Sequence, residues 1–494
     1  MWNSLSSFII KFRILFLFII GGVTFFMAQN AVNVEYSVER AKILPSSHQV
    51  FLDNQNFQNK YGNNQVMAIA ISDSLFFNIN RFLFWDSLCS EIKKINGVEN
   101  IISVNNLSKL EKNSDEKRFE TSKWFNDSLL NQEILDSLLI ELNKQKFYDG
   151  FLNDNNDGAL VLIDLDSEIV ISKNRDDLVF SIKDISEIYS KQYNVPIHYS
   201  GMPYMRSVQS VSLKKEIILF VFLTLLITSL ILYLFFRSFK AMFVSVIVVV
   251  LGVIFAFGFI EMLDYKITLL TALVPPVLIV IGIPNCIFLI NKFHNEYRKN
   301  NNKIKSLKIM IGKIGNITLL TNVTTATGFA AFLLTNSQSL QEFGLIASIN
   351  ILVIYILSLC LIPIFFSFFS PPKPNHTKHL DRKWVVSIVD YLIYLVNNKR
   401  SAIYTVTFIA LLFSVFGLTR MNLTGNLSDD FNKRDTLYKD LKYFENKYKG
   451  VLPLEILVDT KKKNGLFKSY NLKEMEEFSS LLATYSDFSK PSSY

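Results

Sequence analysis

The fold of this chain is limited above all by its long apolar runs, each roughly 17 to 25 residues in length. A run of this length can cross the hydrocarbon core of a bilayer as a single helix. Seven such runs occur, at residues 12–28, 217–236, 241–262, 267–290, 314–334, 343–369 and 403–418. The sequence therefore predicts an α-helical polytopic membrane protein with about seven spans.

Charge and composition agree with this prediction and set the orientation. Hydrophobic residues make up 50% of the chain, more than a soluble protein of this size usually contains. The net charge of +8 comes from Lys and Arg clusters beside the apolar runs, which indicates membrane topology rather than nucleic-acid binding. These clusters fall on one side if the N-terminus is cytoplasmic. Residues 32–213 are then a large domain outside the membrane, and the expected location is the bacterial inner membrane.

The spans also predict the domain organisation. We expect a first span, an outer α+β domain with a helical insertion, spans two to six, a cytoplasmic linker with an amphipathic interfacial helix, a seventh span, and the start of a second outer domain. Their ranges are 1–31, 32–213 with the insertion near 105–157, 214–370, 371–400, 401–420 and 421–494.

Within the outer domain, strand-like and helix-like patterns alternate. Apolar and β-branched segments predict strands at residues 66–71, 98–104, 160–165 and 197–200. Helical periodicity predicts helices at residues 83–95 and 178–193. Their order along the chain predicts two β-α-β repeats.

A short internal repeat links the two ends of the chain. Five residues recur in the same order and at constant spacing: Asp53, Phe57, Asn59, Lys60 and Tyr61 return as Asp440, Phe444, Asn446, Lys447 and Tyr448. At that spacing Arg13 and the first apolar run fall on Arg400 and the seventh run, which favours a first span over a cleaved signal peptide. We therefore expect the first half of a parallel-duplicated protein plus the start of its second half, in a chain truncated or split at Tyr494.

The sequence gives little support for enzymatic or metal-dependent functions. The three cysteines, Cys89, Cys286 and Cys360, and the five histidines are scattered along the chain. They do not have the spacing of a metal site, and no set of nucleophile, base and orienting residue is visible. We expect no enzymatic activity, no cofactor and no metal site.

Several short sequence motifs occur in a specific order along the chain. They are Gly201-Met202-Pro203 before the second run, LFFRSFKA at residues 234–241, Gly282-Ile283-Pro284-Asn285 in the fourth run, TTATGF at residues 324–329, and Glu342-Phe343-Gly344 before the sixth run. With the order of one span, a large outer domain and five close spans, the chain resembles the resistance-nodulation-division (RND) superfamily. The resemblance is to its MMPL and Patched-like branch, which has a sterol-sensing-type membrane domain, and it covers essentially the whole chain.

This resemblance implies a transporter or exporter of hydrophobic or lipidic cargo, driven by an ion gradient through rocking of the two repeats. It implies membrane lipids and a lipidic substrate as partners, together with a homo-oligomer or a partner chain that supplies the second half; no nucleic acid is expected. Proton-driven relatives place an Asp directly after the Gly-x pair of the fourth span. Here that position is Pro284, so the coupling ion stays open.

The most polar stretch inside the apolar runs lies in the fifth. Thr318, Thr321, Asn322 and Thr325 recur at three- and four-residue spacing and so share one helical face. The layout of the family implies that this face meets Asn285. One interpretation is a hydrated path for protons or a cation. The other is that the threonines bond to their own helix carbonyls and Asn322 joins two helices.

Three prolines occur in the fourth run. Pro275, Pro276 and Pro284 are predicted to break its helix, which fits a discontinuous helix beside a transport site. A kink that serves packing alone is the alternative interpretation.

Two other functions stay open at this point. Spans two to six resemble a sterol-sensing domain, and the missing Asp would suit a lipid sensor that transports nothing. An accessory subunit of protein secretion would have the same six-span unit.

Overall fold

The structure of the chain is a computed structural model. It describes residues 2–36, 48–61, 65–113, 118–125, 130–142, 158–372, 383–421, 433–448, 456–458, 460, 465 and 468–485. The chain divides into two compact units. Residues 1–53 with 210–424 form one unit, here called the membrane unit because it contains the long apolar helices. Residues 54–209 with 425–494 form the other, here called the outer unit after the outer domain that the sequence predicts.

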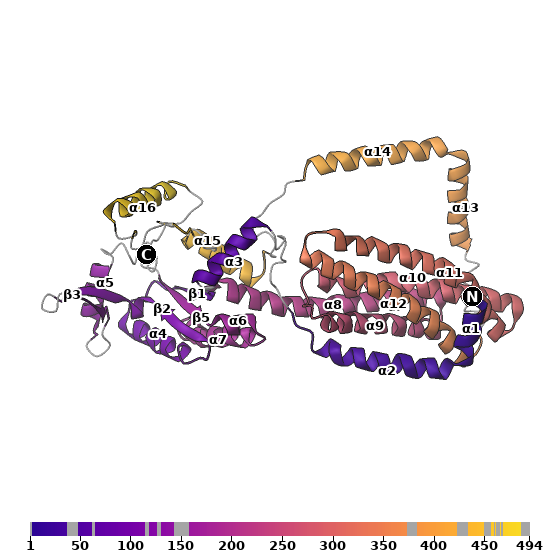
Figure 1. Ribbon diagram of the computed structural model, residues 1–494, viewed down its shortest axis with the longest axis horizontal. Coiled ribbons are helices and arrows are strands. Elements are labelled where there is room, and N and C mark those ends of the chain that lie inside the picture. Colours follow the sequence, from indigo (N-terminus) through magenta and orange to yellow (C-terminus); the bar gives the residue numbers. More distant parts are fainter. Residues whose placement is uncertain are drawn as a thin grey trace. The chain divides into compact units, whose positions relative to one another are not determined.

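The membrane unit consists of long helices (Figure 1). Among the described residues, seven helical segments are long and apolar enough to cross a bilayer, which confirms the seven predicted spans. In chain order they are α2 (Arg13–Val32), α8 (Met202–Phe236), α9 (Phe239–Met262), α10 (Val274–Asn300) preceded by a 3₁₀ turn (Thr271–Leu273), α11 (Lys303–Ala330) followed by a 3₁₀ turn (Ala331–Leu334), α12 (Gln338–Phe368) and α14 (Arg400–Thr419).

Helix α12 is the most buried of these helices and packs against α9, α10 and α11. Small residues allow the close approach. A Cβ atom on Gly252 of α9 would lie 2.4 Å from Cγ1 of Ile354, and one on Gly282 of α10 would lie 2.9 Å from its Cγ2. Helices pack through small residues in this way because lipid gives them no hydrophobic drive to associate. The glycines therefore fix α9 and α10 against α12.

Helix α2 packs along α9, and the short α1 (Trp2–Lys11) contacts α11 and α12. Helix α13 (Lys383–Asn398) follows in the chain, where the amphipathic linker helix was predicted. The side chains of Trp384 and Val385, which carried part of that prediction, lie outside the described residues. The described side chains of α14 are all exposed.

The outer unit contains a four-stranded antiparallel sheet with the order β2-β5-β1-β6. Its strands are β1 (Gln65–Ser72), β2 (Val98–Ile102), β5 (Gly158–Leu165) and β6 (Ile197–Ser200). Helix α4 (Ile79–Ile92) connects β1 to β2, and α7 (Arg175–Tyr193) lies between β5 and β6 in the chain.

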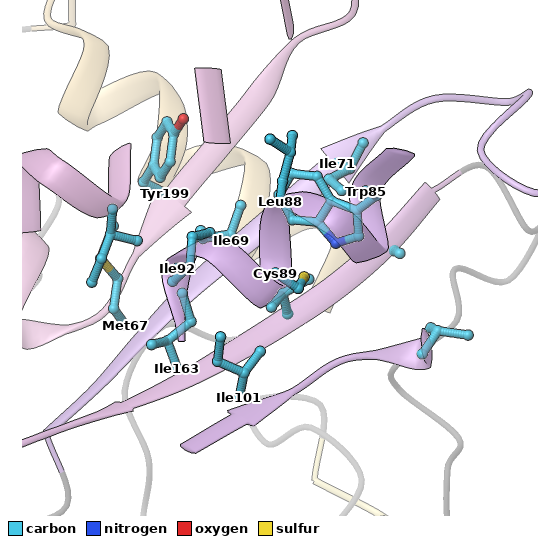
Figure 2. Close-up of a cluster of buried hydrophobic side chains, with 14 of the residues drawn as sticks. Met67, Ile69, Ile71, Trp85, Leu88, Cys89, Ile92, Ile101, Ile163 and Tyr199 are labelled. Atoms are coloured by element: carbon cyan, nitrogen blue, oxygen red, sulfur yellow. The ribbon is translucent and has the colours of Figure 1, made fainter. Parts of the chain in front are cut away.

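The core of this unit lies between the sheet and its helices, and Figure 2 shows the part between the sheet and α4. Alternate residues of β1 point inward, so Met67, Ile69 and Ile71 are fully buried. Trp85 of α4 is also buried and meets the ring of Tyr189 from α7 edge to face, with 5.5 Å between ring centroids. This contact joins the two helices on the sheet.

Between β2 and β5 the predicted helical insertion contains α5 (Gln132–Leu142), with Leu135, Leu139 and Leu142 buried. It also contains a hairpin that the sequence analysis did not predict, formed by β3 (Ser108–Asn113) and β4 (Arg118–Lys123). Short α6 (Ser167–Ile171) precedes α7. The chain also forms α3 (Gln49–Tyr61) and α16 (Ser469–Leu482).

Helix α15 (Thr436–Tyr448) lies in the range predicted to start a second outer domain, but it packs on the edge strand β6. Leu437 and Leu441 join the core of the outer unit, and the Asp440 carboxylate lies 2.9 Å from His198 Nδ1. Sequence analysis missed this contact because the repeat identifies equivalent segments but not the sheet on which each one packs. In the second copy of the repeat, the sequence of residues 454–458 also predicts a strand. Residues 454 and 455 lie outside the described residues, and residues 456–458 form no strand.

Candidate functional site

A cavity of about 330 Å³ lies between α10 and α11. Its walls are mainly apolar, and a short polar strip crosses it. The lining residues are Val280, Ile281, Pro284, Asn285, Phe288, Ile314, Ile317, Thr318, Thr321, Asn322 and Thr325. All five polar residues predicted for the site therefore line one cavity, here called the α10–α11 cavity.

Two amide side chains in the lining of this cavity bond to each other. Asn285 Nδ2 donates to Asn322 Oδ1 at 3.0 Å, and Asn322 Nδ2 donates to Asn285 Oδ1 at 2.9 Å. Asn322 Nδ2 also donates to the carbonyl of Thr318 at 2.7 Å. Both asparagines are buried. An unpartnered amide in apolar surroundings would cost about 1–3 kcal/mol, so each asparagine is held in place by the other.

The threonine hydroxyls bond within their own helix. Thr318 Oγ1 donates to the carbonyl of Ile314 at 2.9 Å, Thr321 Oγ1 to that of Ile317 at 3.0 Å, and Thr325 Oγ1 to that of Thr321 at 2.9 Å. These are the bonds that the packing interpretation predicts. Their hydrogens are thus engaged, whereas the oxygen lone pairs of exposed Thr321 and half-buried Thr325 can still accept from a guest in the cavity.

The predicted helix break at the three prolines is wrong, because α10 is continuous from Val274 to Asn300. Pro275 and Pro276 lie in its first turn, where the backbone N–H groups have no helical partner and a proline removes no bond. They do not line the cavity. Pro284 lies inside the helix and lines the cavity. Since proline has no N–H, the carbonyl of Val280 cannot receive its usual helical bond from position 284.

The α10–α11 cavity contains no ionisable side chain among its described lining residues. Across the described part of the chain, no group of three or more His, Cys, Asp or Glu residues is placed to hold a metal ion. The cavity can therefore accept or donate hydrogen bonds and contact apolar groups, but its lining offers no carboxylate that could take up a proton.

Sequence reasoning missed a buried acid near the end of α10. Glu296 is buried and pairs with Lys292 at 3.1 Å and with Lys313 of α11 at 3.5 Å. The four-residue spacing of Lys292 and Glu296 was the available signal for this pair. Neither partner lines the cavity, so Glu296 serves to join the ends of the two helices.

Comparison with known families supports the predicted resemblance. The family model described as the MMPL family matches residues 96–390, which is more than half of the chain. The match includes the sheet strands β2, β5 and β6, helices α8 to α12 and both asparagines of the cavity. No curated protein matches the chain. Because the match covers more than half of the chain, the chain belongs to the MMPL family of membrane proteins.

Proposed function

We propose that this chain is an RND-type transporter that moves hydrophobic or lipidic cargo and uses an ion gradient, without an enzymatic step. The observation that carries the proposal is the MMPL match, which covers three of the four strands of the outer sheet and five of the membrane helices. An ion crossing the membrane supplies about 2.3 kcal/mol per charge for each 100 mV. That energy would drive the rocking of two repeats.

Matching helix bounds support a duplicated architecture. Helices α2 and α14 are both 20 residues long, and α3 and α15 are both 13 residues long. The separation of Arg13 from Arg400 equals that of Gln49 from Thr436, so both helix pairs keep the spacing of the sequence repeat. In this proposal a second half, or a partner copy, would complete the transporter.

The α10–α11 cavity is the proposed ion route. Two features support this role: the amide pair, which gives a polar crossing between two spans, and the Val280 carbonyl, which lacks its helical donor at Pro284. Irregular backbone at membrane depth is tolerated where it lines a cavity or is covered by protein.

A lipid sensor is the second candidate, and one observation favours it. Among the described residues no carboxylate lines the cavity, and the two asparagines bond to each other without any guest. A sensor would use the same membrane unit to bind a lipid and would carry no ion current.

A transport assay with substituted amides separates these two candidates. Asn285→Leu and Asn322→Leu each break the amide pair and remove the polar crossing, so we expect cargo movement in reconstituted vesicles to fall at least about tenfold. Ion-gradient-dependent lipid movement is the measurement. Asn350→Leu is the matched control, since Asn350 is a buried span asparagine that bonds only within α12 and does not line the cavity. Unchanged transport in both cavity variants would rule out the ion route.

The orientation is tested by thiol labelling. The three native cysteines are buried, and burial raises the pKa of the Cys89 thiol to about 12, so the parent chain should react little with a maleimide. Lys94→Cys and Lys299→Cys each place a thiol at an exposed position. With an impermeant maleimide on intact spheroplasts, we expect labelling at position 94 at once and at position 299 only after permeabilisation. The reverse pattern would contradict a cytoplasmic N-terminus.

A further inference from the structure

Three cations from three different helices meet at the end of α12. Arg13 is the first residue of α2, Lys240 is the second residue of α9, and Lys303 is the first residue of α11. The side chains of all three contact residues between Ser367 and Ser370. These helices belong to the membrane unit, so the cluster lies where several spanning helices begin or end.

The contacts are specific. Lys303 Nζ donates to the carbonyl oxygens of Ser367 at 2.7 Å and Phe369 at 3.1 Å. Arg13 Nη1 donates to Ser367 Oγ at 3.2 Å, and its guanidinium lies 4.5 Å from the centroid of the Phe368 ring.

On the other side, Lys240 Nζ donates to Ser370 Oγ at 2.6 Å and lies 5.4 Å from the centroid of the Phe369 ring. We call Arg13, Lys240 and Lys303 the α12-end cations.

The charges in this cluster do not cancel. A helix C-terminus carries about half a negative charge, which favours one nearby cation but leaves most of three positive charges uncompensated. Within the part of the chain that the structure describes, the ion pairs of Asp and Glu residues go to other cations, and none includes an α12-end cation. Lys240 and Ser370 are exposed, so an anion can reach them.

Exposed aromatic rings lie beside two of the cations. Phe368 beside Arg13 is 49% exposed, and Phe239, directly before Lys240, is 64% exposed and stacks on Phe243. The positive-inside rule accounts for cations near this end of the spans, but not for their convergence on one helix end. Lys305, in the same connection as Lys303, is exposed and makes no side-chain bond of this kind among the described residues.

We propose that the α12-end cations form a binding site for the phosphate headgroup of an anionic lipid, with the exposed rings contacting its acyl chains. Charge favours an anion, and apolar rings beside the cations favour a lipid over free phosphate. Basic clusters between spans at a membrane surface bind such headgroups. The inference needs only the membrane unit and would stand if the proposed transport did not.

Native mass spectrometry of the full chain in a neutral detergent tests the site. We expect phosphatidylglycerol to bind about tenfold more tightly than phosphatidylcholine, because only the former carries a net negative charge. Lys240→Gln and Arg13→Gln should each weaken phosphatidylglycerol binding about fivefold, since each removes one charge near the surface. Lys305→Gln, which removes an equal charge outside the cluster, should leave this binding within about twofold of the parent chain.

Inorganic phosphate at millimolar concentration is the second probe, and it should fail to displace the bound phosphatidylglycerol. Equal binding of the two lipids, complete displacement by phosphate, or an equal loss in Lys305→Gln would each overturn the proposal. Lys240 is exposed, so Lys240→Gln should keep the melting temperature of the parent, and this variant alone decides the question if Arg13→Gln does not fold.

Discussion

Replacing Gly201 by alanine is expected to destabilise the outer unit by about 3–5 kcal/mol. Gly201 connects β6 to α8 with φ +102°, a left-handed conformation that disfavours any residue with a Cβ atom. An added Cβ would also lie 2.2 Å from the backbone oxygen of Val66 on β1, and backbone cannot move aside as a side chain can. Both effects act together, which makes this one of the most sensitive positions in the outer unit.

Gly97→Ala is the matched control for this change. Gly97 has nearly the same φ, +100°, but its added Cβ would meet only the side-chain tips of Ile169 and Leu178, at 2.9 and 3.0 Å. We therefore expect a loss of about 1–2 kcal/mol, mostly from backbone strain. Thermal melting followed by tryptophan fluorescence reports on the outer unit, because Trp85 and Trp124 are buried in its core. The Gly201 variant should melt roughly 10 °C below the parent, and equal melting of both variants would refute the steric argument.

The same glycine shows what the sequence could and could not reveal. Gly201-Met202-Pro203 was identified as a motif through family resemblance alone. The structure supplies the physical reason why its first residue is glycine. The seven spans could be predicted because twenty apolar residues in a row have few alternatives to a membrane helix. Strand β1 lies within one residue of its predicted range, because a short apolar run with β-branched residues is typical of a buried strand.

The cavity was partly predictable for a similar reason. Helical spacing alone placed Thr318, Thr321, Asn322 and Thr325 on one face. The choice of Asn285 as their partner depended on resemblance, because no periodicity relates residues on two different helices. The helix break was wrong because sequence reasoning took each proline as an interruption. In fact Pro275 lies in the first turn of α10, and Pro284 lies within a helix that packs against α9, α11 and α12.

Contacts between segments far apart in the chain could not be predicted, because they produce no periodic pattern in the sequence. The approach of Arg13, Lys240 and Lys303 to the end of α12 requires the packed bundle. The docking of α15 on β6 likewise brings together residues that are far apart in the sequence, such as Asp440 and His198.

A network around Asp73 is another contact of this kind, and it ties three elements of the outer unit together. Asp73 follows β1 directly and is buried, with 3% of its surface exposed. Its carboxylate accepts bonds from Arg81 of α4 at 2.7 Å, from the hydroxyl of Tyr189 in α7 at 2.8 Å, and from the Leu75 N–H at 2.9 Å. Burial, together with the bond to Asp73, raises the pKa of Tyr189 above its ordinary value, so this hydroxyl remains a donor.

Asp73→Ala should therefore lower the unfolding free energy of the outer unit by about 3 kcal/mol, since it leaves a buried tyrosine hydroxyl and a partly buried guanidinium without their acceptor. Asp73→Asn keeps an acceptor for Tyr189 and should lose about half as much. Glu187→Ala is the control, because its pair with Lys183 is at 3.6 Å and partly exposed, and exposed pairs of this kind contribute about 0–1 kcal/mol. Tryptophan-monitored melting again gives the comparison. If Asp73→Ala and Glu187→Ala melted at the same temperature, the buried carboxylate would not be what holds β1, α4 and α7 together.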